Sequence, residues 1–121
     1  MIYVNGDRAE GLKVIASLFQ DRITEDQVVE FDICPIKSDD ETIGMLMIRG
    51  PEVHVAILPE YRRRWLTRGL IHEVLDGIEN EYGYCLTSCF SDEERNIDFI
   101  TRLGFKQIHT ENGMIFFERV T

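Results

Sequence analysis

The stretch that decides the fold runs from Val53 to Arg68 and reads VHVAILPEYRRRWLTR. Its apolar beginning is typical of a buried strand, and Pro59 marks the end of that strand. The chain then becomes basic and enters a helix over about residues 63–81, in which apolar side chains recur at every fourth position. Helix N-terminal amides and nearby arginines together attract anions, above all phosphate groups. This stretch therefore predicts a small-anion site where the helix begins.

The rest of the chain extends this strand and helix into one α/β domain over residues 1–121. Capping-box patterns at Asp7, Thr24 and Ser91 each predict the start of a helix, and Asn112-Gly113 predicts a hairpin turn. The expected strands cover about residues 2–4, 31–35, 43–48, 53–58, 84–90, 105–109 and 114–120, and the expected helices cover about 8–19, 24–29, 63–81 and 91–103. The order is roughly β-α-α-β-β-β-α-β-α-β-β, so we expect a mixed, twisted sheet flanked by helices.

Composition and charge restrict the kinds of partner. The 121 residues are 44% hydrophobic and 29% charged, the balance of one globular domain, and the net charge is −9. Residues 62–68 (RRRWLTR), the basic segment, hold four of the 13 basic residues and none of the 22 acidic ones. An acidic body repels duplex nucleic acid and anionic membranes, so we expect the basic segment to bind a small, local anion.

Other patterns argue against a membrane protein, a secreted protein or a metalloprotein. No run approaches the roughly 20 apolar residues of a membrane helix, and the start MIYVNGD lacks the features of a signal peptide. Cys34, Cys85 and Cys89 form no metal-binding motif, and the last two lie about 13 Å apart on one strand face, too far for a disulfide. We therefore expect a cytoplasmic protein with reduced thiols and no metal site.

The junction around residues 53–62 resembles that of the GNAT superfamily of N-acetyltransferases. In that family an apolar strand ends in a turn of the type Pro-x-Tyr-Arg-x-x-Gly-x-Gly, and this chain has Pro59-Glu60-Tyr61-Arg62 at that place. A later helix of the family ends in Leu-Gly-Phe, which stands here as Leu103-Gly104-Phe105. The resemblance covers about residues 42–120 and implies a single GNAT-like acyltransferase domain.

The resemblance implies that acetyl-coenzyme A, or coenzyme A, is the cofactor. The family's turn holds the pyrophosphate of the coenzyme, which makes the whole basic segment the expected binding site: Arg62, Arg63, Arg64, Trp65, Leu66, Thr67 and Arg68. The family also uses backbone amides at the end of the preceding strand to polarise the thioester carbonyl, and the matching residues are Ile57 and Leu58. The implied reaction is direct attack of an amine on acetyl-coenzyme A, bound where two central strands splay apart.

Three positions depart from the family pattern and leave the activity open. Trp65 and Thr67 stand where the family has small residues, usually glycine, that let backbone amides approach the pyrophosphate. Ile100 stands where the family has a tyrosine that protonates the leaving thiolate. The competing interpretation is a catalytically inactive binding or structural protein on the same fold. Small acidic GNAT-like proteins of tailed phages, including virion components, are similar to this chain in pattern.

An acetyl transfer also needs a base, because a protonated amine cannot attack a thioester. His54 and Glu52, on or beside the strand that would face the acceptor, are the candidates. Nothing selects the acid among Tyr82, Tyr84, Ser88 and Thr101. The acceptor is a small-molecule or peptide amine, and the acidic body favours a cationic one such as a polyamine, an aminoglycoside or a basic protein tail. Strand edges near Pro35 or in the hairpin 105–120 offer a pairing surface for a homodimer.

Overall fold

The computed structural model describes residues 2–4, 6–19, 23, 25–61 and 68–120. Its described helices are α1 (Arg8–Phe19), α2 (Arg68–Tyr82) and α3 (Glu94–Arg102), with the 3-10 turns η2 (Glu25–Val28) and η3 (Pro59–Tyr61). Its described strands are β1 (Ile2–Val4), β2 (Asp32–Ser38), β3 (Glu41–Arg49), β4 (Glu52–Ile57), β5 (Cys85–Phe90), β6 (Lys106–Glu111) and β7 (Met114–Arg119). The predicted order is confirmed, except that the second predicted helix is a 3-10 turn. Within the described residues, none of the helices is long and apolar enough to cross a membrane.

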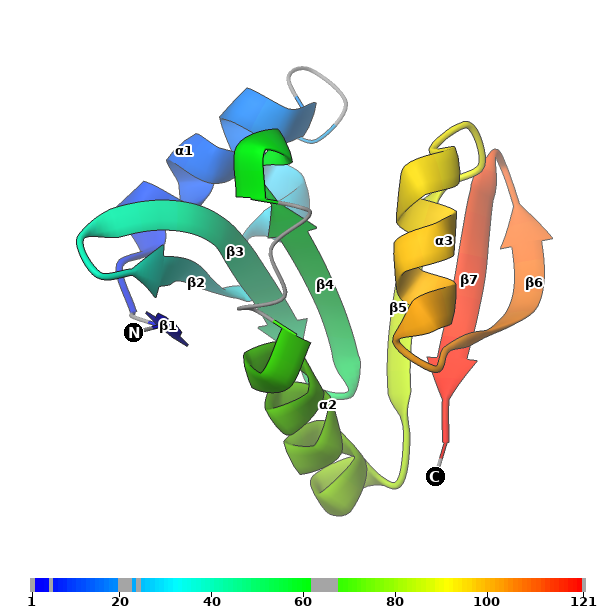
Figure 1. Cartoon of the computed structure of the whole chain (residues 1–121). Coiled ribbons are helices and arrows are strands. Elements are labelled where there is room, and N and C mark those ends of the chain that lie inside the picture. The colour runs from blue at the N-terminus through cyan, green and yellow to red at the C-terminus, as the bar shows by residue number, and fades with distance from the viewer. Residues whose placement is uncertain (1, 5, 20–22, 24, 62–67, 121) are drawn as a thin grey trace. The chain divides into compact units, whose positions relative to one another are not determined.

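The strands form one sheet in the order β1-β2-β3-β4-β5-β7-β6 (Figure 1). β4 pairs with β5 in parallel through Glu52 and Leu86, while β1–β2, β2–β3, β5–β7 and β6–β7 are antiparallel. The parallel pair meets the expectation from the strand–helix–strand order, since a parallel connection needs a crossover rather than a tight turn. The predicted fold class, a mixed sheet with helices, is confirmed.

Packing divides the chain into two compact units. The first contains Met1–Arg49 and His54–Ile71, and the second contains Gly50–Val53 and His72–Thr121. β4 and α2 each pass from one unit into the other. Each unit has its own set of buried apolar side chains. The contacts of a residue are therefore described within its own unit.

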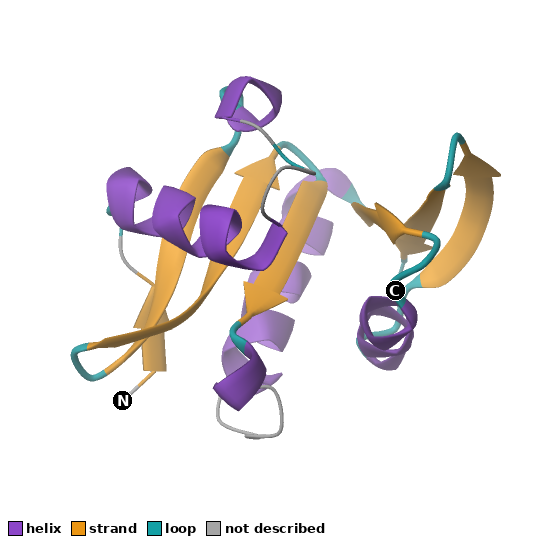
Figure 2. Ribbon diagram, turned by 90° about the horizontal axis from the view of Figure 1, so that it is seen from above, coloured by secondary structure: helices purple, strands orange, loops and turns teal. Residues whose placement is uncertain are grey.

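In the first unit, α1 packs against β2 and β3 (Figure 2). Its N-terminus is capped as predicted, because Asp7 Oδ1 accepts a 3.2 Å hydrogen bond from the backbone N–H of Glu10. Lys37 ties the helix to the sheet, since its Nζ donates to Glu10 Oε1 at 2.7 Å and to Thr42 Oγ1 at 3.0 Å. The core of this unit, called the α1 core below, contains Val14, Ile15, Val28, Phe31, Ile33, Met45, Met47 and Ala56.

In the second unit, α3 lies on one face of β5, β7 and β6 (Figure 2). The buried side chains here include Cys85, Cys89, Ile100, Leu103, Phe105, Ile115 and Phe117. The predicted hairpin is confirmed: Asn112 (φ 50°) and Gly113 (φ 77°) join β6 to β7, and both have the positive φ that a type I′ turn requires.

Pro35 lies within β2 and does not end it. It stands opposite Met45 of β3, whereas the described part of β1 reaches only Ile36 on the other side. A register shift follows at once, between Ile36 and Lys37. The irregularity expected near Pro35 is therefore present, but β2 is an inner strand paired with both β1 and β3, so the expected strand edge near Pro35 is wrong.

The capping box predicted at Ser91 is wrong. α3 begins at Glu94 and its N-cap is Glu93, whose side chain makes no cap hydrogen bond. The Glu93 carboxylate instead accepts a hydrogen bond from the side-chain amide of Asn96. Ser91 instead lies in the turn directly after β5, where its N–H donates to the Gly113 carbonyl at 2.9 Å, and the helix begins only after this turn.

Candidate functional site

The predicted base and thioester residues lie along β4 and just beyond it. His54 is half-buried and Ile57 is buried, while Leu58 packs partly buried against the α1 core. Because alternate residues of a strand share a face, His54 lies on the same face as Ala56, which is part of the α1 core. Glu52 is half-buried at the start of β4 and belongs to the second unit.

β4 approaches β3 closely at Gly44. A Cβ atom on Gly44 would lie 2.3 Å from the carbonyl oxygen of Ala56 and 3.1 Å from the Cα of Ile57, so only glycine leaves room for this approach. Just beyond, the N–H of Leu58 donates a 2.8 Å hydrogen bond to the carbonyl of Ile43. The Leu58 amide is therefore already engaged, and a thioester carbonyl would have to displace Ile43 or use another donor.

The turn η3 carries the chain from β4 toward the basic segment. The N–H of Tyr61 donates to the Leu58 carbonyl at 2.9 Å, which closes the turn. The hydroxyl of Tyr61 donates a 2.6 Å hydrogen bond to Oε2 of Glu41, the first residue of β3. Both bonds fix the point from which the basic segment starts.

The basic segment itself lies almost entirely outside the described residues. Of the predicted coenzyme-binding residues, this applies to Arg62, Arg63, Arg64, Trp65, Leu66 and Thr67 and to the side chain of Arg68. The backbone of Arg68 begins the described part of α2. The structure thus has β4, η3 and α2 in the predicted order along the chain, and the role of the residues between them stays a prediction.

His54 has an aromatic neighbour, Phe31, that sequence reasoning missed, and Phe31 in turn contacts a charged residue. Its ring lies edge-on to Phe31, with ring centroids 5.6 Å apart and an interplanar angle of 65°. The guanidinium carbon of Arg49 lies 4.5 Å from the centre of the same Phe31 ring. Phe31 precedes His54 by 23 positions, and no local spacing pattern links two residues so far apart.

Among the residues that the structure describes, none of the predicted candidates stands out as an acid in place of the family's tyrosine. Ile100 is 8% exposed in α3, and its side chain has no proton to donate. The hydroxyl of Thr101 donates to the Ile97 carbonyl of its own helix at 2.8 Å. The other candidates also belong to the second unit, with Tyr82 and Tyr84 exposed and Ser88 half-buried. The assignment of an acid stays open.

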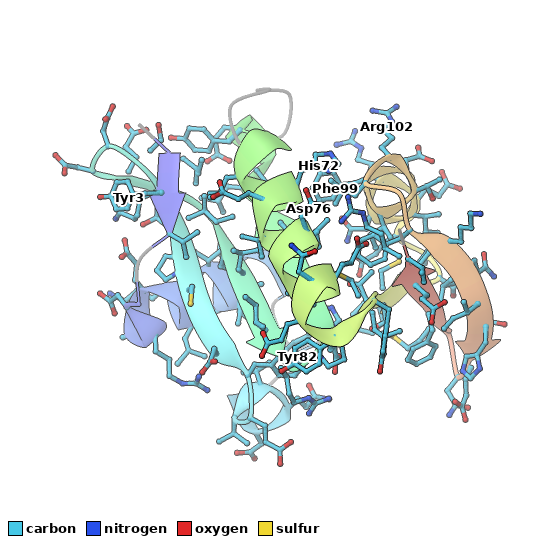
Figure 3. The ribbon with its side chains drawn as sticks, turned by 90° about the horizontal axis from the view of Figure 1, so that it is seen from below. Tyr3, His72, Asp76, Tyr82, Phe99 and Arg102 are labelled. Atoms are coloured by element: carbon cyan, nitrogen blue, oxygen red, sulfur yellow. The ribbon has the colours of Figure 1, made fainter. Side chains whose placement is uncertain are left out.

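A charged cluster in the second unit joins α2 to β7. Arg119 Nη1 lies 3.2 Å from Asp76 Oδ1 and 3.2 Å from Glu79 Oε1, and Arg119 Nη2 lies 3.5 Å from His72 Nδ1. Figure 3 shows His72 and Asp76 on the same side of α2, as expected of helical residues four apart. Because the Arg119 and Glu79 side chains are only 12% and 2% exposed, this is a buried ion pair that holds the helix against the strand.

The two thiols of the second unit, Cys85 and Cys89, have low reactivity. Burial raises the pKa of both Cys85 and Cys89 to about 11, and the nearby carboxylates of Glu79 and Glu93 add to the effect. Cys85 Sγ also donates to the Leu75 carbonyl at 3.3 Å. Protonated, buried thiols are poor nucleophiles and poor metal ligands. All three cysteines are free, and the described part of the chain has no group of three or more His, Cys, Asp or Glu that could hold a metal ion.

No protein-family model matches the sequence, and no curated protein matches it in sequence. Solved structures match the fold over the whole chain. A GNAT family acetyltransferase from Elizabethkingia anophelis with acetyl-CoA bound has a TM-score of 0.75 at 13% identity, with 99% of this chain and 98% of that chain covered.

Two further matches show the same extent of similarity. An N-acetyltransferase from Thermoplasma acidophilum in complex with coenzyme A has a TM-score of 0.71 at 13% identity, covering 100% of this chain and 99% of that chain. A spermidine N-acetyltransferase chimera from Vibrio cholerae and hSSAT has a TM-score of 0.70 at 13% identity, with 98% and 95% covered. The chain therefore has the fold of the GNAT acetyltransferases, which confirms the fold implied by the resemblance. A shared fold does not by itself establish an activity.

Proposed function

We propose that this chain is an acetyl-coenzyme A-dependent N-acetyltransferase that acts on an amine. The observation that carries the proposal is the match of 99% of the chain to a GNAT acetyltransferase with acetyl-CoA bound. The basic segment supports it, because it joins the end of β4 to the start of α2, where helix amides and arginines suit a pyrophosphate. The coenzyme-binding residues would be Ile57, Leu58, Arg62, Arg63, Arg64, Trp65, Leu66, Thr67 and Arg68.

The proposed reaction is a single acyl transfer. A base, His54 or Glu52, takes a proton from the ammonium form of the acceptor, and the freed nitrogen lone pair attacks the thioester carbonyl carbon. The carbon–sulfur bond then breaks, and coenzyme A leaves as a thiolate that takes up a proton. The chain's contribution is to position the two substrates and to polarise the carbonyl with a backbone amide near Ile57.

The charge of the chain supports a cationic acceptor. The net charge of −9 attracts polyamines and basic peptides and repels polyanions. One structural neighbour is a spermidine N-acetyltransferase chimera, which makes spermidine the first acceptor to test. The cytoplasm is the proposed location for such a reaction.

The competing proposal is an inactive binding or structural protein of the same fold, either an accessory protein or, if phage-encoded, a virion component. The observation that favours it is Ile100, which is buried and has no proton to donate. Trp65 and Thr67 support it from the sequence, since both are larger than the residues that normally leave room for the pyrophosphate.

Calorimetric titration with acetyl-CoA tests the binding half of the proposal. We expect micromolar affinity, lost by at least about tenfold in an Arg62→Ala, Arg64→Ala double variant that removes two charged donors. The matched control is Arg95→Ala, Arg102→Ala, which removes the same charge from two exposed positions of α3 and should bind as the wild type does.

Thiol release from acetyl-CoA tests the catalytic half, with spermidine and a lysine-rich peptide as acceptors. Release that depends on the acceptor supports the enzyme. Coenzyme binding without acceptor-dependent release would instead support the inactive protein. No binding at millimolar coenzyme would contradict the proposed enzyme and favour an inactive protein that does not use the coenzyme.

A further inference from the structure

Phe31 makes an aromatic ring contact with His54. The Phe31 side chain is 6% exposed in the α1 core, and His54 is half-buried beside it. Their rings meet edge-on, with centroids 5.6 Å apart at 65°, which is the favoured geometry for an aromatic pair. A buried ring in this position limits the orientations that the imidazole of His54 can adopt.

The backbone of Phe31 is held on both sides. Its N–H donates to the Val28 carbonyl at 3.1 Å, and its carbonyl accepts a 2.6 Å hydrogen bond from Arg8 Nη1. The other guanidinium nitrogen, Arg8 Nη2, donates to the Val28 carbonyl at 3.1 Å. Hydrogen bonds from a charged donor are stronger than those between neutral groups. Arg8 of α1 thus fastens the end of η2, and with it the residue that contacts His54.

The Phe31 ring is also covered by Arg49. The guanidinium carbon of Arg49 lies 4.5 Å from the ring centre, within the range of a cation–π contact. Arg49 Nη1 pairs with Glu30 Oε2 at 3.1 Å, but both side chains are exposed, so this ion pair adds little stability. Its effect is to keep Arg49 over the ring.

Position along β4 separates the two candidate bases. The resemblance places the thioester near Ile57, three residues after His54 and five after Glu52. At about 3.3 Å per residue, these spacings are roughly 10 Å and 17 Å along the strand. The His54 side chain and a small acceptor can together span the shorter distance far more easily than the longer one. The spacing therefore favours His54 over Glu52.

We propose that Phe31 is the positioning residue for His54, that Arg8 fixes Phe31 in turn, and that His54 is the base of the acetyl transfer; this inference rests on the proposed function. The neutral imidazole takes the proton from the acceptor ammonium group, directly or through one water, and holds it while the amine nitrogen bonds to the acetyl carbon. An imidazole with one fixed orientation loses little freedom on reaching the transition state.

The test is steady-state kinetics on four variants of the full chain. His54→Gln should lower kcat by about 100-fold, the lower range for losing a general base. Phe31→Leu keeps an apolar side chain but removes the ring, and should lower kcat by about tenfold with the KM for acetyl-CoA unchanged. Phe31→Tyr restores a ring and should recover most of the activity. Val14→Ala, in the same α1 core, controls for lost stability and should keep the wild-type kcat.

Imidazole proton spectra by NMR test the contact without any activity. His54 is assigned by the signal missing in His54→Gln. Its ring protons should carry a ring-current shift that disappears in Phe31→Leu, while the signals of His72 and His109 stay in place. Arg8→Met removes the hydrogen bonds to the carbonyls of Phe31 and Val28. It should reduce the ring-current shift of His54 and lower kcat in parallel.

The outcomes separate the inference from the function on which it rests. Acetyl transfer in the wild type that survives His54→Gln, or that is equally slow in Val14→Ala and Phe31→Leu, would overturn the inference and leave the enzyme standing. A wild type without acetyl transfer would refute the proposed function itself, and the base role with it. An unshifted His54 signal would refute the contact with Phe31.

Discussion

Tyr61 and Glu41 are joined by a 2.6 Å hydrogen bond, in which the tyrosine hydroxyl donates to Oε2 of the carboxylate. The bond ties η3, directly before the basic segment, to the first residue of β3. A hydrogen bond to a carboxylate is stronger than one between neutral groups, but this one is exposed to water, which reduces its net worth. Its main effect is to fix Tyr61, the residue directly before the basic segment.

Tyr61→Phe removes the hydroxyl and keeps the ring. We expect the free energy of unfolding in urea to fall by about 0.5–1.5 kcal/mol. We also expect the affinity for acetyl-CoA to fall by roughly threefold to tenfold in calorimetry, because the basic segment starts from a less fixed position. Glu41→Gln keeps an acceptor oxygen and should lose less of both. Unchanged coenzyme affinity in Tyr61→Phe would show that this bond does not position the basic segment.

Gly44→Ala places a methyl group where β3 and β4 meet. The added carbon would lie 2.3 Å from the Ala56 carbonyl oxygen, so the strands must move apart and the protein should lose about 1–3 kcal/mol of stability. Gly77→Ala is the matched control, because a Cβ there meets nothing within 4 Å and alanine favours the helix by about 0.5–1 kcal/mol. Urea denaturation should therefore give opposite signs for the two variants, and equal effects would contradict the close approach.

The fold was predictable from the sequence wherever a local signal has one structural meaning. Asn112-Gly113 predicted its hairpin because few other residue pairs accept positive φ twice. Asp7 predicted its helix cap because a short carboxylate side chain can accept a hydrogen bond from the first free backbone amides of a helix, and the bond from the Glu10 N–H is present. The box at Ser91 failed because the same four residues allow two outcomes, and β5–β7 pairing extends far enough to use the Ser91 amide. Competition from the sheet is a long-range effect that local patterns do not contain.

The site was less predictable because it depends on contacts between distant segments. The resemblance of the β4–η3 junction drew attention to Leu58, but not to the hydrogen bond from its amide to Ile43. The composition of residues 30–32 gave no sign that Phe31 would meet His54. Both facts follow from how β2, β3 and β4 pair, and strand register is set by the whole sheet.

The buried thiols predict a loss of stability in alkali. Cys85 ionises near 9 when unfolded and near 11 when folded, so between these values the unfolded state releases a proton that the folded state keeps. Stability is therefore full below pH 9 and falls as the pH rises toward 11. Between pH 8 and 10.5, the free energy of unfolding of Cys85→Ala should fall by up to about 2 kcal/mol less than that of the wild type, measured by urea denaturation.

Two comparisons make the thiol prediction specific. The hydrogen bond to Glu10 raises the pKa of Lys37, so its stabilising effect is also lost as the pH rises through the pKa of the folded state, equally in both proteins. Ile115→Val, in the same sheet, should lower stability by about 0.5–1.5 kcal/mol at every pH without changing the slope. A wild-type slope in Cys85→Ala would mean that this thiol does not titrate as described.

The Arg119–Glu79 pair predicts strong coupling between α2 and β7. Arg119→Met leaves the Glu79 carboxylate, 2% exposed, without its counter-charge, and should lower the free energy of unfolding by about 3–5 kcal/mol. Asp76→Asn should lower it by less than about 1 kcal/mol, because Asp76 is 59% exposed and water screens its charge. The double variant Arg119→Met, Glu79→Met removes both buried charges and should recover more than half of the loss. The single variant Glu79→Met completes the cycle. If the losses of Arg119→Met and Glu79→Met simply add up to the loss of the double variant, the two charges do not interact, and apolar packing rather than ion pairing holds the helix to the strand.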